Sequence, residues 1–329
     1  MIFLNKSHGL YKKIIVIASI PLFLFSVYRL HNYEASIINK KEHEQEIVNL
    51  APESKDTSKT DVSSVIDDSS SEAEKPKKKE RKLQSWAKDL LERNGEAVGW
   101  IKIPGFKNDD GKEYINFPVL QHSDNDYYLY HDIDGLWNES GSIYADFTVK
   151  IDEKGQPDNI VIYGHHMRNL GTSFTHLAEY KDGVDFLKKY PIIEFNTIYD
   201  EEPEEYVIIS CYVAAVDELQ DENLFDYWRY LKFDKTEYKF STWIKRTKEC
   251  SWYSCDVQCD KNDGYITLST CSNEVQGMRW VITAKKLDED DDKNKIIESY
   301  KEKDDTDIYF PPVWSYVWGN HKKYLGWNY

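Results

Sequence analysis

The sequence predicts a mainly β protein: a closed antiparallel or mixed β-barrel of about eight strands, with an N-terminal helix and helical inserts. One observation is a series of short β-type runs between residues 98 and 286, separated from one another by turn residues. A second is that most connections between these runs are too short for the helical crossovers of a doubly wound parallel sheet. Together they favour a barrel.

The elements are expected in the following order. The segment LQSWAKDLLERN (83–94) has apolar residues at helical spacing and ends just before Gly95, a favourable C-cap residue. Helical inserts are expected at 183–190 and across 222–247, and the long connection that holds the second insert is typical of one wall of a binding groove. The predicted strands are 98–103, 117–120, 141–147, 159–165, 192–198, 205–216, 265–270 and 279–286.

The composition of the 329-residue chain fits a globular domain with additional segments at its ends. Hydrophobic residues make up 40% and charged residues 30%, which allows a packed core and excludes a polytopic membrane protein. The formal net charge of -16 argues against a nucleic-acid-binding surface, which would be basic. Aromatic residues make up 14%, a content that suits β structure and binding grooves.

The N-terminal end carries an uncharged apolar run at residues 14–28, preceded by Lys12 and Lys13 and followed by Arg29. The run is slightly shorter than the roughly 18–20 residues of a full membrane span, a difference that snorkelling basic side chains can make up. We therefore predict an uncleaved anchor with a short cytoplasmic tail in residues 1–30, giving a single-pass protein in the cell membrane with its folded domain outside. A cleaved signal peptide is the alternative.

The segments that flank the folded domain differ from it in composition. Residues 31–82 include a long stretch rich in Ser, Glu, Asp and Lys, which predicts a flexible extracellular stalk. The predicted domain itself spans 83–287. An acidic linker and an aromatic C-terminal extension follow at 288–329. We expect the aromatic tail, 307–329, to pack onto the domain, with binding of sugar or peptide and contact with a membrane interface as alternatives.

A reactive group is suggested where the strand-forming run TLSTCS (267–272) reaches Cys271. The next predicted strand begins at Arg279, so a short connection would bring the thiol and the guanidinium together at one end of the barrel. A guanidinium there can lower the pKa of a thiol and stabilise an oxyanion. His165 and His166 follow another strand and supply a proton acceptor or donor. Together, the cysteine, the arginine and a histidine fit thiol acyl transfer. Each also has a purely structural interpretation, namely a buried core Cys, a solvated Arg and surface or capping His residues.

These motifs resemble the signature of the sortases, the cell-wall transpeptidases of Gram-positive bacteria. The resemblance lies in TLSTC with the downstream Arg279 and in the upstream segment IVIYGHHM (160–167). The segments FPVLQHSDNDYYLYHD (117–132) and GSIYADF (141–147) resemble the class B branch in particular. The resemblance covers about residues 83–287 and implies a sortase-like barrel.

The resemblance also implies catalytic roles for three residues. Cys271 would be the nucleophile that attacks the backbone carbonyl of a sorting motif. Arg279 would hold the substrate and stabilise the tetrahedral oxyanion. His165 would protonate the leaving amine and later take a proton from the incoming amine; His166 ranks second for that role, because the family motif places the catalytic His directly after Gly.

Substrate contacts are expected from three further residues. Ser269 and Thr270 lie beside the nucleophile in the sequence, and Asn125 matches an Asn that lines the class B groove. The connection between Cys271 and Arg279 is shorter than in some relatives, which affects fine substrate contacts but not the reaction. No metal or organic cofactor is expected, since acyl transfer of this kind needs none.

The implied function is a membrane-anchored cysteine transpeptidase. It would cleave a sorting motif in secreted proteins through a Cys thioester and join them to an amine of a peptidoglycan precursor or cross-bridge, with no nucleic-acid partner. Alternatives are a sortase that polymerises pilin subunits through a Lys side chain and a secreted Cys-His protease that uses water. A non-enzymatic alternative is a tethered binding protein that uses the aromatic tail.

The remaining cysteines leave the disulfide pattern open. Cys250, Cys255 and Cys259 are spaced C-x4-C-x3-C without a histidine at zinc-finger distance, which makes zinc binding a weak hypothesis. A disulfide between two of them is compatible with an extracellular protein. Cys211 falls in an apolar strand and is expected in the core. Because the chain has five cysteines, at least one stays unpaired in the monomer, and Cys271 is the natural one.

Overall fold

The computed structural model describes residues 19–20, 23–28, 46–52, 81–167, 171–233 and 237–322 of the chain. The chain divides into two compact units, residues 1–49 and 50–329. In the first unit, the described residues 19–20, 23–28 and 46–48 are helical. All the elements discussed below belong to the second unit.

The structure contradicts the predicted anchor and the cell-membrane location inferred from it. Among the residues that the structure describes, no helix combines the length and the apolar character needed to cross a bilayer. Within the predicted anchor, residues 1–18, 21–22 and 29–30 lie outside the described residues. The same holds for most of the predicted stalk, of which only 46–52 and 81–82 are described.

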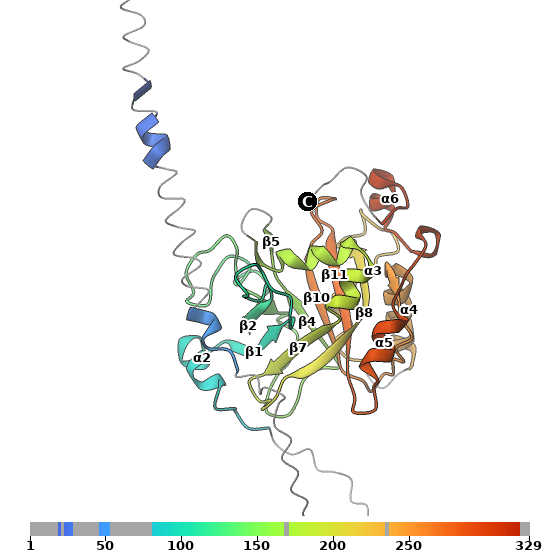
Figure 1. Cartoon of the computed structure of the whole chain (residues 1–329), viewed down its shortest axis with the longest axis horizontal. Helices are drawn as coiled ribbons and strands as arrows, with labels where there is room; N and C mark the ends of the chain where they lie inside the picture. The colour runs from blue at the N-terminus through green and yellow to red at the C-terminus, as the bar shows by residue number, and fades with distance from the viewer. Residues whose placement is uncertain are drawn as a thin grey trace, which may run out of the picture. The chain divides into compact units, whose positions relative to one another are not determined.

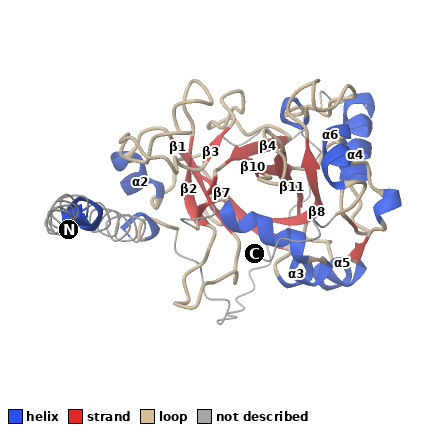
Figure 2. Cartoon of the chain, turned by 90° about the horizontal axis from the view of Figure 1, so that it is seen from above, coloured by secondary structure: helices blue, strands red, loops and turns tan. Residues whose placement is uncertain are grey.

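The second unit is built around a closed barrel, which confirms the predicted fold class. The strands follow the order β1-β2-β3-β4-β10-β11-β8-β7 around the ring, and Figure 2 shows this ring from above. Most neighbours are antiparallel, but β2–β3 and β4–β10 are parallel, so the barrel is mixed. The strands are β1 (Ala97–Lys102), β2 (Asn116–Leu120), β3 (Tyr144–Ala145), β4 (Asn159–Tyr163), β7 (Ile192–Thr197), β8 (Glu204–Ala214), β10 (Tyr265–Cys271) and β11 (Arg279–Lys286).

The strands β10 and β11 are buried along almost their whole length, as expected of strands that are covered on both faces. Every residue of β10 except Cys271 is buried, and in β11 only the two terminal residues, Arg279 and Lys286, are partly exposed. Helices provide the outer cover: α4 (Glu237–Cys250) packs against β8, and α2 (Ala87–Arg93) lies beside β1 on the opposite side of the ring (Figures 1 and 2).

The predicted strand boundaries agree with the structure to within two residues, except for the strand predicted at 141–147. The segment 141–147 forms only a two-residue strand, because Gly141 has a positive φ and Asp146 turns the chain through its hydrogen bonds to Thr148. The first helix begins at Ala87 rather than at residue 83, since the backbone N–H of Gln84 donates to Ile198.

Helical inserts and two small sheets complete the domain. The 3-10 helix η1 (Thr175–Asp182) and α3 (Val184–Lys189) occupy the connection between β4 and β7, where a helix was expected at 183–190. The insert expected across 222–247 contains the 3-10 turn η2 (Tyr227–Arg229) followed by α4. The small sheets pair β5 (His166–Met167) with β6 (Thr172–Ser173), and β9 (Tyr253–Ser254) with β12 (Lys301–Glu302).

The described part of the C-terminal extension packs onto the barrel domain. It contains α5 (Lys293–Ser299), β12, the 3-10 turn η3 (Asp305–Asp307) and α6 (Pro312–Trp318). Phe310 and Trp314 are buried in the same apolar core as β8 and β11. The Tyr309 hydroxyl donates to Asp221, and its ring lies 4.4 Å from the Arg246 guanidinium. The compact fold therefore continues well beyond residue 287.

Candidate active site

The barrel brings Cys271 and Arg279 directly opposite each other. Cys271 is the last residue of β10 and Arg279 the first of β11, and the two are partners in the antiparallel register. Both side chains are half-buried. The register follows from a short connection, 272–278, which we call the nucleophile loop. It closes on itself because the Ser272 N–H donates to Met278 O at 3.1 Å.

The parallel contact between β4 and β10 brings His165 to the same end of the barrel. Tyr163 lies opposite Ser269, and the next residue, Gly164, donates its N–H to Ser269 O at 3.2 Å. His165 follows directly and is half-buried. A side chain at Gly164 would collide with Ile143 and Phe174, whose atoms lie 2.5 and 2.8 Å from the position of a Cβ. The glycine of the YGHH segment is therefore needed for close packing.

The His165 ring is oriented by a backbone carbonyl. Its Nε2 lies 2.7 Å from Leu129 O, and since a carbonyl can only accept, Nε2 carries a hydrogen. In the neutral ring, Nδ1 is then the unprotonated nitrogen, and the same carbonyl also stabilises the protonated ring. Leu129 belongs to the long loop between β2 and β3, so this loop controls the orientation of His165.

The structure gives His166 a different environment. Its side chain is 8% exposed, and its Nδ1 donates to Cys271 O at 2.9 Å. The Asn273 side chain in turn donates to His166 O at 3.3 Å. The His166 ring is therefore held by the end of β10 and its carbonyl by the Asn273 side chain, while His165 is the more accessible of the two histidines.

The Arg279 guanidinium and the Cys271 thiol both affect the pKa of two buried tyrosines, Tyr144 and Tyr227. Burial raises the pKa of Tyr144, and the positive charge of Arg279 opposes part of this rise. Burial also raises the pKa of Tyr227 to about 12, opposed by the Ser269 hydroxyl and by Arg279. The positive charge of Arg279 therefore lowers the pKa of both tyrosines relative to the effect of burial alone.

Ser269 and Thr270, expected to touch the substrate, are each 1% exposed. The Ser269 hydroxyl is 2.7 Å from the Tyr227 hydroxyl. Tyr227 lies in η2, so Ser269 connects β10 to the insert that was predicted to line a groove. The Thr270 hydroxyl is buried without a hydrogen-bond partner among the described residues. Their role in binding remains a prediction.

Asn125 lies in the loop between β2 and β3, where it bonds a buried carboxylate. Its Nδ2 donates to Asp146 Oδ2 at 3.0 Å, and its Oδ1 accepts from the Phe147 N–H at 3.0 Å. Asp146 is 3% exposed and also accepts from the Tyr163 hydroxyl at 2.8 Å. In this structure both ends of the Asn125 amide hold the loop in place, and substrate contact by this residue also remains a prediction.

The other cysteines differ from Cys271 in their surroundings. All five are free thiols in the structure. Burial raises the pKa of Cys211 and Cys255, that of Cys250 to about 12 and that of Cys259 to about 11. These four are therefore protonated and unreactive near neutral pH. Within the described ranges, no group of three or more His, Cys, Asp or Glu side chains could hold a metal ion.

Several site residues were not found from the sequence. Tyr144 and Asp146 lie in the segment GSIYADF, which was noted only as a resemblance, and Tyr227 lies in the insert. The Leu129 carbonyl gave no signal at all, because a backbone group carries no residue identity. Their contacts with the candidate site exist only in the tertiary structure, where the loop between β2 and β3 and the insert lie beside the end of β10.

Comparison with known proteins identifies the family. The chain is 32% identical over 192 residues to sortase B of Listeria monocytogenes, a match that covers 57% of this chain and 67% of that protein. The chain belongs to the class B sortases. It is also 29% identical over 181 residues to sortase B of Staphylococcus aureus, covering 55% of this chain and 65% of that protein. No family model matches the chain.

Solved structures of class B sortases share the fold. The Staphylococcus aureus sortase B-substrate complex matches with a TM-score of 0.53 and 28% identity, covering 63% of this chain and 87% of that chain. A Bacillus anthracis protein described as similar to sortase B matches with a TM-score of 0.52 and 26% identity, covering 64% of this chain and 88% of that chain. The chain is therefore a sortase-type cysteine transpeptidase.

Proposed function

We propose that Cys271, His165 and Arg279 carry the transpeptidase reaction, and that the substrate is a sorting motif in secreted proteins. In the first half, the Cys271 thiolate attacks the scissile carbonyl carbon, and the resulting oxyanion is stabilised by Arg279. The intermediate collapses as the C–N bond breaks and the leaving amine takes a proton from the His165 ring. The product is a thioester between Cys271 and the substrate protein.

In the second half, an amine attacks the thioester carbonyl and gives a proton to His165. The C–S bond breaks, Cys271 leaves as the thiolate, and a new amide bond remains. One peptide bond is thus exchanged for another without net hydrolysis. The Leu129 carbonyl suits this cycle because it can bond Nε2 in both protonation states of His165, which leaves Nδ1 to exchange the proton.

The observation that carries this proposal is the cross-strand pairing of Cys271 with Arg279, with His165 following the parallel neighbour of the same strand. Two consecutive strands, β10 and β11, and the end of the distant strand β4 thereby present a nucleophile, a cation and a proton carrier at one end of the barrel. His165 is preferred over His166 for proton transfer, since His166 is buried against Cys271 O.

For the amine, we propose a peptidoglycan precursor or cross-bridge. A sortase B has been solved in complex with triglycine, and the Staphylococcus aureus sortase B has been solved with substrate. Triglycine carries a primary amine, the group that the second half of the reaction requires. A pilin Lys side chain and water are the competing acceptors, and the experiment below distinguishes them.

The test uses the full chain incubated with a panel of fluorogenic sorting-motif peptides, with and without triglycine or a lysine-containing peptide. Intact mass reads the thioester, and chromatography reads the ligated product. Cys271→Ala serves as the control without a nucleophile. His165→Ala and His166→Ala are compared directly, and Arg279→Lys tests whether the planar guanidinium is required.

Formation of a Cys271 adduct and a ligated product that depends on triglycine would support the proposal. Loss of ligation by about 100-fold or more is expected for His165→Ala, because general acid-base catalysis typically contributes about 10²–10⁴-fold. Cleavage that does not change with added amine would indicate a protease instead. Preference for the lysine peptide would indicate a polymerising sortase, and full activity of Cys271→Ala would refute the mechanism.

A further inference from the structure

A buried ion pair lies beneath the nucleophile loop. The Lys181 ammonium is 2.6 Å from Glu274 Oε1, and the two side chains are only 5% and 4% exposed. Lys181 also donates to Ser272 O at 3.1 Å. Glu274 and Ser272 both belong to the nucleophile loop, whereas Lys181 comes from η1, 91 residues before Ser272 in the chain. The pair therefore fixes the loop to a distant part of the fold.

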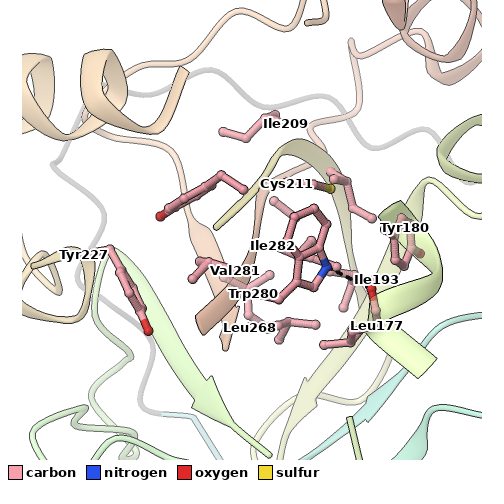
Figure 3. Packing of buried hydrophobic residues seen from close by; sticks show 14 of the residues in the cluster. Leu177, Tyr180, Ile193, Ile209, Cys211, Tyr227, Leu268, Trp280, Val281 and Ile282 are labelled. Carbon is pink, nitrogen blue, oxygen red and sulfur yellow. Dashed lines mark hydrogen bonds between the residues drawn. The ribbon is translucent and has the colours of Figure 1, made fainter. Parts of the chain in front are cut away.

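The position of Lys181 is itself fixed by the core. Its ammonium lies 5.0 Å from the centre of the Trp280 ring, within the range of a cation–π contact. Trp280 is fully buried beside Arg279 in β11, and its indole N–H donates to Leu177 O of η1 at 2.9 Å, as Figure 3 shows. Thus η1, the start of β11 and the nucleophile loop are held together around one lysine.

The contacts act on the backbone that carries the nucleophile. The Lys181 ammonium bonds the carbonyl of Ser272, and the His166 ring bonds the carbonyl of Cys271. Two consecutive peptide groups at the end of β10 are thereby oriented by side chains from outside the loop. At the other end of the loop, Arg279 donates to Gly277 O at 3.0 Å, so the same loop also orients the guanidinium.

We propose that Lys181, paired with Glu274, is a positioning residue of the transpeptidase, which sets the nucleophile loop so that Cys271 and Arg279 meet the scissile carbonyl together. This inference rests on the proposed roles of those two residues. A buried ion pair is a poor source of stability, because desolvation offsets most of its attraction. What such a pair does provide is one defined arrangement of the groups it joins, and here these groups flank the nucleophile.

The chain offers a matched control at the far end of the same strand. Lys285 is 5% exposed in its side chain, lies in β11 and bonds Asp291 at 3.1 Å. Its cross-strand partner is Tyr265, at the opposite end of β10 from Cys271. Lys285→Met therefore removes an equally buried lysine from the same sheet without touching the nucleophile loop. Comparison with Lys181→Met separates loss of positioning from loss of stability.

The experiment compares the parent full chain, Lys181→Met and Lys285→Met in two measurements. The first is the rate of thioester formation at Cys271 as a function of sorting-peptide concentration, read by intact mass. The second is hydrogen exchange of the loop amides, 272–278. For Lys181→Met we expect the maximal rate to fall by about 10- to 100-fold, with half-saturation within about threefold of the parent, because small misplacements cost rate more than binding. Loop exchange should accelerate.

Lys285→Met should show neither change, even where its melting temperature falls. A rate for Lys181→Met within about threefold of the parent, or an equal loss in Lys285→Met, would overturn the inference, since positioning effects are expected at about tenfold or more. If Lys181→Met does not fold, Lys181→Arg and Glu274→Gln replace it: the first keeps the charge and should recover most of the rate, and the second should not.

Failure of the proposed function would look different. In that case the parent itself would form no thioester, and Lys181→Met would still be judged by the hydrogen exchange of the loop. Unchanged exchange in a folded Lys181→Met would overturn the inference by itself, because the pair would then not hold the loop.

Discussion

A single methyl group at Gly141 should disturb His165, the proposed catalytic histidine, without touching it. Gly141 lies in the loop between β2 and β3 and has a φ of +53°, a conformation that costs other residues about 1–2 kcal/mol. A Cβ built there would lie 2.4 Å from Tyr128 O and 2.5 Å from Leu129 O. The second of these oxygens accepts the hydrogen bond from His165.

The size of the effect follows from that contact. To reach an ordinary van der Waals separation of 3.4 Å, the contact with Leu129 O must lengthen by roughly 0.9 Å. A misplacement of about 1 Å at a catalytic group can cost about 10²-fold in rate. We therefore expect Gly141→Ala to lower kcat/KM by about 10- to 100-fold. Its free energy of unfolding should fall by about 2–5 kcal/mol, combining the backbone cost with that of overpacking.

Gly105→Ala is the matched control. Gly105 also has a positive φ, +76°, but nothing lies within 4 Å of the position of its Cβ. This variant should lose only about 1–2 kcal/mol of stability and none of its activity. Both variants are measured by urea unfolding and by peptide ligation with triglycine. The link from Gly141 through Leu129 to His165 would be refuted by either of two results. One is an equal free energy of unfolding for Gly141→Ala and Gly105→Ala. The other is a kcat/KM for ligation by Gly141→Ala within about threefold of the parent.

Two further predictions concern ionisation. At pH 8, iodoacetamide should modify Cys271 well before Cys250 and Cys259. Their pKa values of about 12 and about 11 leave only about 10⁻⁴ and 10⁻³ of these two thiols as reactive thiolate. Peptide mapping that finds early label on Cys250 or Cys259 would contradict this. Although partial burial opposes it, a backbone N–H and the Lys285 ammonium hold the pKa of Asp291 below its ordinary value of 3.8. The ionised Asp291 therefore stabilises the fold fully above pH 3.8, and this stabilisation is lost as the pH falls through the lower pKa of the folded state. In urea unfolding measured at a series of pH values, the free energy of unfolding of Asp291→Asn should fall less steeply at acid pH than that of the parent. An equally steep fall in both proteins would count against this prediction.

The strands and the geometry of the strand ends could be predicted from local sequence. The segment TLSTC and the strand that begins at Arg279 are rich in β-forming residues and separated by a short connection. A short connection between adjacent strands leaves few arrangements, and the structure does pair Cys271 with Arg279. The predicted cell-membrane location was wrong, because among the residues that the structure describes no helix has the length and apolar character to cross a bilayer.

The sequence by itself determined the barrel class, the sortase resemblance and the residue types of the reaction, since each depends on local patterns along the chain. Only the tertiary structure decided which groups orient them. Leu129 bonds His165, and Lys181 bonds the carbonyl of Ser272, across separations of 36 and 91 residues. Such contacts involve a backbone carbonyl and a buried charge, neither of which leaves a periodic signal in the sequence. They depend on the closed barrel, which brings residues far apart in the sequence to one end.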